Sequence, residues 1–160
     1  MPVYFFTYHA YGTWMPDRAR GYTRRGADIR SPDPRMAQRY RENMAETPGV
    51  FSPSVQRAMI DELQNAGERQ GYQLYAVGSD PTHLHVLVGW KYRRTWLRVR
   101  AGLQSSLTRR LNRDTHKRTW FVARPSRKRV KDRSHHDYLI GTYIPNHRGW
   151  KWDRIRGLYR

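Results

Sequence analysis

The chain has 160 residues with 31 Lys or Arg against 13 Asp or Glu, a formal charge of +18, and 38% of its residues are hydrophobic. This length suits one domain with a modest core, and four Phe, six Trp and eleven Tyr argue against full disorder. The absence of cysteine excludes a disulfide scaffold, a thiolate zinc site and a cysteine nucleophile. We expect a single domain over residues 1–160, in which any metal is held by His, carboxylate or amide groups.

No apolar run approaches the roughly 18 residues that a membrane-spanning helix requires. The first residues, MPVYFFTYHAYGTW, also lack the basic-then-apolar order of a signal peptide. The sequence therefore predicts a soluble cytoplasmic protein without a membrane partner.

The charge is distributed unevenly along the chain. Residues 1–90 contain 10 Lys or Arg and 9 Asp or Glu, whereas residues 91–160 contain 21 and 4. A positive field of this size attracts nucleic acid in a salt-dependent way, and the excess of Arg suits bidentate phosphate contacts. We predict a nucleic-acid partner for the second half. A ribosomal or nucleoid packing protein and a protein with an acidic partner are the alternatives.

The first half begins with a β-branched and aromatic stretch at 3–9 that predicts a strand. Residues 17–50 are polar and rich in Arg, Pro and Gly, and they predict a long loop or insertion with one helix-permitting stretch at 34–44. Ser52 or Ser54 can cap an amphipathic helix that runs to about residue 69.

The middle of the chain predicts an antiparallel hairpin, with strands at 72–78 and 83–89 around a Ser-Asp-Pro turn. Leucines and a valine at helical spacing predict a second long helix over about 94–112. A strand or ribbon is expected from residue 120 through 130, followed by a last helix capped by Ser134. This order predicts an α+β sandwich, with helices packed on an antiparallel sheet.

The most informative short motif is His83-Leu84-His85. Side chains alternate along a strand, so both imidazoles point to one face while Leu84 points to the core. Such a pair is a bidentate platform for a metal ion. The alternative is a pair of surface histidines beside an apolar strand.

A second set of polar residues lies near the C-terminus, where Tyr143 and His147 stand at i and i+4. On a helix these residues share one face. A metal held by His83, His85 and His147 would lie within reach of the Tyr143 hydroxyl, which could attack a phosphodiester and form a phosphotyrosine. Pro145 lies between the two residues and would remove one helical hydrogen bond.

The alternative for Tyr143 is a core aromatic with its hydroxyl at the rim, since the chain contains eleven tyrosines. Tyr138 is the second candidate for a nucleophile, but its i+4 partner is Thr142, a poorer metal ligand than histidine.

These motifs together resemble the single-tyrosine HUH transposases of bacterial insertion sequences, and especially the REP-associated tyrosine transposases. The resemblance rests on YFFTYHAYGTWMPDRARGY near the N-terminus, on THLHVLV, and on WFVARPSRKRVKDRSHHDYLIGTYIPNHRGWKW near the C-terminus. The three segments follow the expected order along nearly the whole chain.

The resemblance implies a ferredoxin-like α+β domain that cuts and rejoins single-stranded DNA beside a hairpin, usually as a homodimer. It implies that His83, His85 and His147 hold Mg²⁺ or Mn²⁺, and that Tyr143 is the nucleophile. The product would be a 5′-phosphotyrosine and a free 3′-hydroxyl, and rejoining would reverse the reaction. The expected location is the bacterial cytoplasm, in association with the nucleoid.

A basic run over residues 117–133 predicts DNA contacts, although a strand would present only alternate residues to one partner. The alternative is a solvated, charged edge that prevents sheet association. The candidate DNA-binding residues are Arg118, Arg124, Arg127, Lys128, Arg129, Lys131 and Arg133. Trp150 and Trp152 could stack on unpaired bases or bury against the sheet.

Three functions follow from this reading. The first is a metal-dependent transposase that acts through a tyrosine nucleophile. The second is a domesticated, non-catalytic protein that binds a DNA or RNA hairpin without cutting it. The third, a replication or mobilisation nickase with the same chemistry, is disfavoured by the short chain.

Overall fold

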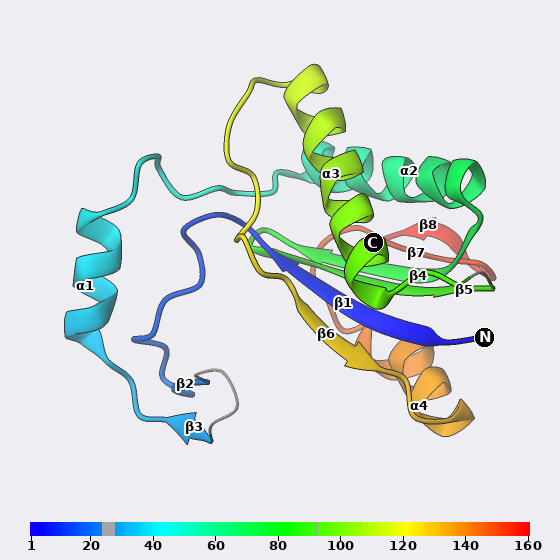
Figure 1. Ribbon diagram of the computed structural model, residues 1–160, viewed down its shortest axis with the longest axis horizontal. Helices are drawn as coiled ribbons and strands as arrows, with labels where there is room; N and C mark the ends of the chain where they lie inside the picture. Colours follow the sequence, from blue (N-terminus) through cyan, green and yellow to red (C-terminus); the bar gives the residue numbers. More distant parts are fainter. Residues whose placement is uncertain (24–27, 92) are drawn as a thin grey trace.

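The centre of the molecule is a six-stranded sheet in the order β6-β1-β5-β4-β7-β8 (Figure 1). The computed structural model describes residues 1–23, 28–91 and 93–160. All neighbouring strands of the sheet run antiparallel. The strands are β1 (Val3–His9), β4 (Tyr72–Asp80), β5 (His83–Trp90), β6 (Ser126–Arg129), β7 (Lys151–Asp153) and β8 (Gly157–Tyr159).

Two long helices, α2 (Pro53–Gln70) and α3 (Trp96–Asp114), cover one face of the sheet (Figure 1). The opposite face carries α4 (Arg133–Tyr138) and the π-helical segment η1 (Leu139–Tyr143). The element order β1-α2-β4-β5-α3-β6, with β1 and β5 at the centre of their four strands, is the ferredoxin-like arrangement. The predicted α+β sandwich is therefore confirmed.

Local sequence signals fix the ends of helix α2. The Ser52 side chain accepts a hydrogen bond from the Val55 backbone N–H, and Pro53 occupies the first turn, where its missing N–H costs nothing. The helix ends at Gly71, whose φ of 68° is a left-handed conformation that glycine adopts without strain. Of the two serines that could cap this helix, Ser52 does so.

The two faces of the sheet bury different sets of side chains. Alternate residues of β1 and β5, such as Phe6 and Val86, join the main core beneath α2 and α3. The residues between them, such as Phe5 and Leu87, join a smaller cluster beneath η1 with Leu139 and Ile144. The smaller cluster supports the face that carries the candidate site.

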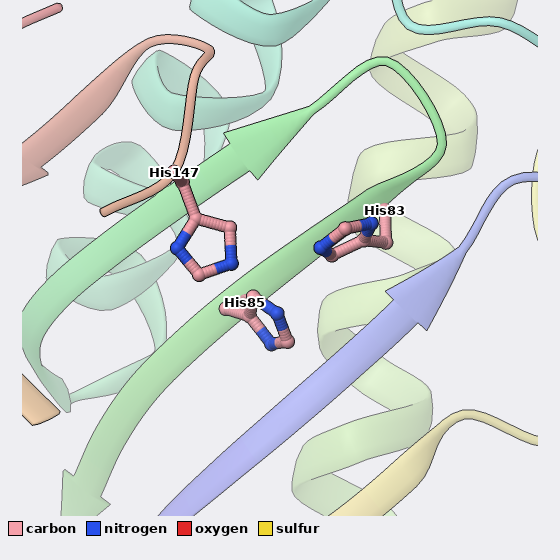
Figure 2. Close-up of side chains that lie close together, drawn as sticks. All are labelled: His83, His85 and His147. Carbon is pink, nitrogen blue, oxygen red and sulfur yellow. The ribbon is translucent and has the colours of Figure 1, made fainter. Parts of the chain in front are cut away.

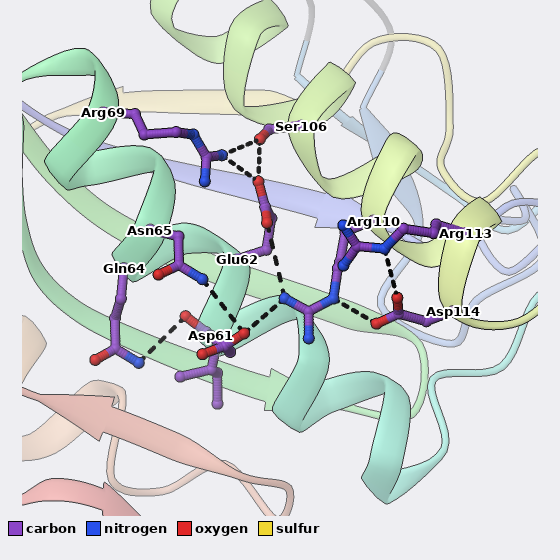
Figure 3. A network of polar contacts seen from close by, with 10 residues as sticks. Asp61, Glu62, Gln64, Asn65, Arg69, Ser106, Arg110, Arg113 and Asp114 are labelled. Atoms are coloured by element: carbon purple, nitrogen blue, oxygen red, sulfur yellow. Dashed lines mark hydrogen bonds and ion pairs between the residues drawn. The ribbon is translucent and has the colours of Figure 1, made fainter.

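A polar network joins α2 to α3 on the outer side of the main core (Figure 3). Glu62 is 8% exposed, accepts a hydrogen bond from Ser106 and lies 2.6 Å from the Arg69 guanidinium. Arg110 lies 2.6 Å from Asp61 and 3.8 Å from Glu62. The buried carboxylate is therefore satisfied by one hydroxyl and two guanidinium groups.

The segment expected to be a long loop or insertion over 17–50 contains short elements. Strands β2 (Tyr22–Thr23) and β3 (Ile29–Arg30) pair with each other, and α1 (Pro34–Glu42) coincides with the helix-permitting stretch. Figure 1 shows these elements at one side of the sheet, away from α2 and α3. Residues 24–27 of this segment lie outside the described residues.

Two expectations for the C-terminal half are wrong in detail, and one hairpin there was not predicted. The strand or ribbon expected over 120–130 begins with only an isolated bridge between Phe121 and Ala10, and the regular strand is limited to Ser126–Arg129. Asp132, not Ser134, caps α4 by accepting the His135 backbone N–H. The Trp-rich tail, for which no strand was predicted, forms the β7–β8 hairpin.

Among the described residues, no helix is long and apolar enough to cross a membrane.

Candidate metal centre and its tyrosine

Strand β5 presents His83 and His85 to the face of the sheet opposite the long helices. Leu84 lies between them and is fully buried in the main core, as strand alternation predicts. The two imidazole rings are 4.8 Å apart, and His85 is 5% exposed. Leu84 therefore belongs to the main core, whereas the two histidines of the motif belong to the candidate site.

His147, in the segment that follows η1, lies on the same face of the sheet as His83 and His85. Its ring centroid lies 5.5 Å from that of His83 and 4.6 Å from that of His85. The segment is fixed to the end of β4, since the Gly149 N–H donates to the Ser79 carbonyl and the Ser79 N–H donates to the Trp150 carbonyl. The buried Lys151 ammonium also donates to the His147 carbonyl, at 2.7 Å.

The three imidazoles converge on one point (Figure 2). Each offers a nitrogen, and the three nitrogens lie within 4.8 Å of one another. His147 Nδ1 lies 3.0 Å from the Tyr143 carbonyl oxygen, which can only accept, so Nδ1 carries the proton and Nε2 has the free lone pair. Nδ1 of His85 and Nδ1 of His83 also have partners, the hydroxyls of Thr7 and Thr82. Partners of this kind orient metal-binding histidines.

Burial keeps the central imidazole neutral. The pKa of His85 is lowered to about 2, first by desolvation and then by the neighbouring His147 and His83. The pKa of His83 is also lowered by burial, although the Asp80 carboxylate opposes this shift. A neutral imidazole has the lone pair that a metal ion needs. The group of three histidines could therefore hold a metal ion.

Asp80 and Thr7 also belong to this centre, although no sequence motif predicts them there. Asp80 Oδ2 lies 3.4 Å from His83 Nε2 and 4.0 Å from His147 Nε2. The Thr7 hydroxyl lies 2.8 Å from His85 Nδ1. Asp80 belongs to the predicted Ser-Asp-Pro turn. Its position three residues before His83 is the sequence feature that could have indicated its place in the centre.

Tyr143 is the last residue of η1 and stands beside the histidines. Its ring centroid is 5.4 Å from that of His85 and 5.3 Å from that of His147. Burial raises the pKa of its phenol. Tyr138, the second candidate, is 52% exposed, and its ring centroid lies 6.3 Å from that of Tyr143.

The expected i and i+4 pairing of Tyr143 and His147 on one helix is wrong. The segment over 139–143 is π-helical, with the Ile144 N–H donating to the Leu139 carbonyl, and residues 144–146 form a turn. Pro145 lies in this turn, where it removes no helical hydrogen bond. The Tyr143 and His147 rings nevertheless lie side by side, because the turn brings the imidazole back beside the phenol. Such π-helical segments often occur at functional sites.

A cleft of about 440 Å³ opens beside Tyr143, between β6 and α4. Phe5, Thr7, Lys128 and Tyr138 line it together with Tyr143. The cleft is therefore lined by the Tyr143 phenol, the Lys128 cation and the rings of Phe5 and Tyr138, beside the histidine group.

The predicted DNA-binding residues do not form one surface. Lys128 lies opposite Phe5 in the ladder and so faces the cleft. Arg127 borders the cleft, but its guanidinium lies 3.8 Å from the centroid of Trp96, on the helix-covered side. Arg118 donates to the Thr47 carbonyl and contacts Glu46. The others, all of them exposed, are Arg124, Arg129, Lys131 and Arg133.

The two tryptophans of the C-terminal segment pack against the main core. Trp150 and Trp152 are partly buried there, and the Arg57 guanidinium lies 5.2 Å from the Trp150 ring centroid. Of the two alternatives for these residues, the structure shows burial against the sheet.

Comparison with known proteins supports the fold. A scan against family models finds no match, and a search of the curated proteins finds none either. Several solved structures are similar to this chain, among them the following two. One is a REP-associated tyrosine transposase bound to a REP hairpin, with 9% identity and a TM-score of 0.49 over 89% of this chain. This chain spans 64% of that protein's length.

The other similar structure is a Deinococcus radiodurans R1 protein described as a "putative transposase". It has 16% identity and a TM-score of 0.51, over 92% of this chain and 91% of that one. At this identity the comparison concerns the backbone and not the chemistry. The chain therefore shares its α+β fold, over nearly its whole length, with that Deinococcus protein.

Proposed function

We propose that the protein is a metal-dependent, single-stranded DNA endonuclease and strand transferase, that is, a transposase with Tyr143 as its nucleophile. The observation that carries the proposal is the convergence of Tyr143 with three histidines from two separate segments. His83, His85 and His147 would hold the ion, either Mg²⁺ or Mn²⁺.

In this proposal the Tyr143 oxygen attacks the phosphorus of a DNA phosphodiester. The bond from phosphorus to the 3′ oxygen breaks, the phenol loses its proton to solvent, and the leaving oxygen gains one. The products are a 5′-phosphotyrosine and a 3′-hydroxyl, and the reverse reaction rejoins the strand. A bound divalent ion would supply a Lewis acid that offsets the charge on the phosphoryl oxygens.

The residues around Tyr143 suit this role. The Phe5 and Tyr143 rings pack edge to face with their centroids 5.6 Å apart, and this contact fixes the plane of the phenol. Lys128 in the same cleft provides a cation for the DNA backbone. The second half of the chain supplies the wider positive field. Recognition of a hairpin and a homodimeric state come from the sequence resemblance and belong to the proposal.

Labelled single-stranded DNA that carries candidate hairpins tests the proposal when it is incubated with the protein, with and without Mn²⁺. A denaturing gel then reveals any covalent DNA adduct. Wild type and Tyr138→Phe should form the adduct, and Tyr143→Phe should bind the DNA without forming it. An adduct from Tyr143→Phe would show that another residue is the nucleophile.

If the wild type binds hairpins tightly but forms no adduct with any divalent metal, the non-catalytic hairpin-binding alternative replaces the proposal. Light scattering of the free protein and of its hairpin complex checks the homodimer.

A further inference from the structure

We infer that Asp80 is a fourth protein ligand of the metal, completing a site of three imidazoles and one carboxylate. This inference rests on the proposed function of the same site, and it adds a ligand that the histidine motif does not contain. It follows from the position of one oxygen atom between two of the histidines.

The distances from Asp80 to two of the histidines fit a shared set of metal ligands. Asp80 Oδ2 lies 3.4 Å from His83 Nε2 and 4.0 Å from His147 Nε2. Donor atoms bound to the same ion at about 2.1 Å lie roughly 3 to 4 Å apart. The carboxylate oxygen thus already stands at the spacing of a shared coordination shell.

The two oxygens of Asp80 have different partners. Oδ1 accepts a hydrogen bond from the Arg148 backbone N–H at 2.9 Å, which orients the carboxylate and links it to the segment that carries His147. Oδ2 faces the Nε2 atoms, whose imidazoles each have Nδ1 occupied by another partner. One oxygen therefore positions the group while the other is directed at the ion.

The negative charge of Asp80 also suits a ligand for a divalent cation. The three imidazoles are neutral as ligands, so a divalent ion held by them alone would keep its full +2 charge. The Asp80 carboxylate would lower the net charge of the occupied site from +2 to +1. Its hard oxygen also suits Mn²⁺, which soft donor sets do not favour.

The Asp80→Asn variant separates a ligand from a merely structural residue. The amide keeps an oxygen that can accept the Arg148 N–H but loses the charge. Titration calorimetry of the metal-free protein with Mn²⁺ should show that the Kd rises at least tenfold in Asp80→Asn, with no change in the control Asp28→Asn, an exposed aspartate. Visible spectra of the Co²⁺ forms should differ between wild type and Asp80→Asn.

A Kd for Mn²⁺ within twofold of wild type, with an unchanged Co²⁺ spectrum, would overturn the inference and leave the proposed function intact. Tight Mn²⁺ binding that depends on Asp80, in a protein that forms no DNA adduct, would support the inference while refuting the proposed reaction. No Mn²⁺ binding by the wild type would overturn both. Circular dichroism of the metal-free variants confirms that they are folded.

Discussion

Lys128 stands directly opposite Phe5 in the β1–β6 ladder, and Phe5 packs edge-on against the Tyr143 ring. Strand alternation therefore places one cation of a dense basic run on the side of the proposed nucleophile. Its neighbour Arg129 pairs with Tyr4, a residue of the main core, and so faces the other way.

This arrangement predicts that two equal changes in charge have unequal effects. Lys128→Ala should weaken single-stranded DNA binding several-fold and lower the salt slope of the binding constant by about one. Arg129→Ala should have the smaller effect, because its side chain points away from the cleft. Fluorescence anisotropy over a series of salt concentrations measures both, and equal losses would mean that orientation plays no part.

The glycine that fixes His147 gives a second prediction. A Cβ at Gly149 would lie 2.3 Å from both the Ser79 carbonyl oxygen and Gln56 Oε1, too close for either to remain in place. Gly149→Ala should therefore displace the His147 segment and raise the Kd for Mn²⁺ at least tenfold, as measured by calorimetry. A Cβ at Gly141 would meet nothing within 4 Å, so Gly141→Ala is the matched control. Similar Mn²⁺ affinities in both variants would contradict this account.

Metal binding should also stabilise the folded state. An ion that binds only the native protein adds about 2.7 kcal/mol at a free concentration one hundred times its Kd. Wild type should therefore unfold at a higher temperature in Mn²⁺ than in EDTA, whereas His85→Ala should show little difference. Differential scanning calorimetry makes the comparison, and an equal shift in His85→Ala would place the ion elsewhere.

The polar network between α2 and α3 predicts a change in stability without a change at the site. Glu62→Ala leaves Ser106 without its acceptor and removes a carboxylate between two guanidinium groups, which should cost about 1 to 3 kcal/mol. Urea unfolding measures this, with the exposed Glu68→Ala as the control. Mn²⁺ affinity should not change, and a loss of it would mean that the helix pair supports the site directly.

Local signals were sufficient for the regular parts of the fold. The alternation of His83, Leu84 and His85 appears as predicted, and Ser52, one of the two serines proposed as a cap, begins helix α2. The α+β class follows from the order of such elements.

Parts that depend on tertiary contacts could not be obtained in this way. The β7–β8 hairpin exists because β7 pairs with β4, about seventy residues away, and not because of a strong strand pattern. The register of η1 and the return of His147 likewise depend on packing against the sheet. Asp80 looked like an ordinary turn residue, since its partners are revealed only when residue 148 comes beside it.

The β4–β5 turn that carries this site is bound by chain segments far apart in sequence. The Ala10 N–H donates to the Thr82 carbonyl, the Phe51 N–H to the Pro81 carbonyl, and the Gly149 N–H to the Ser79 carbonyl. A fluctuation that frees the turn must break contacts to all three segments together. The amide protons of Ala10, Phe51 and Gly149, which these carbonyls accept, should therefore exchange with solvent near the rate of global unfolding.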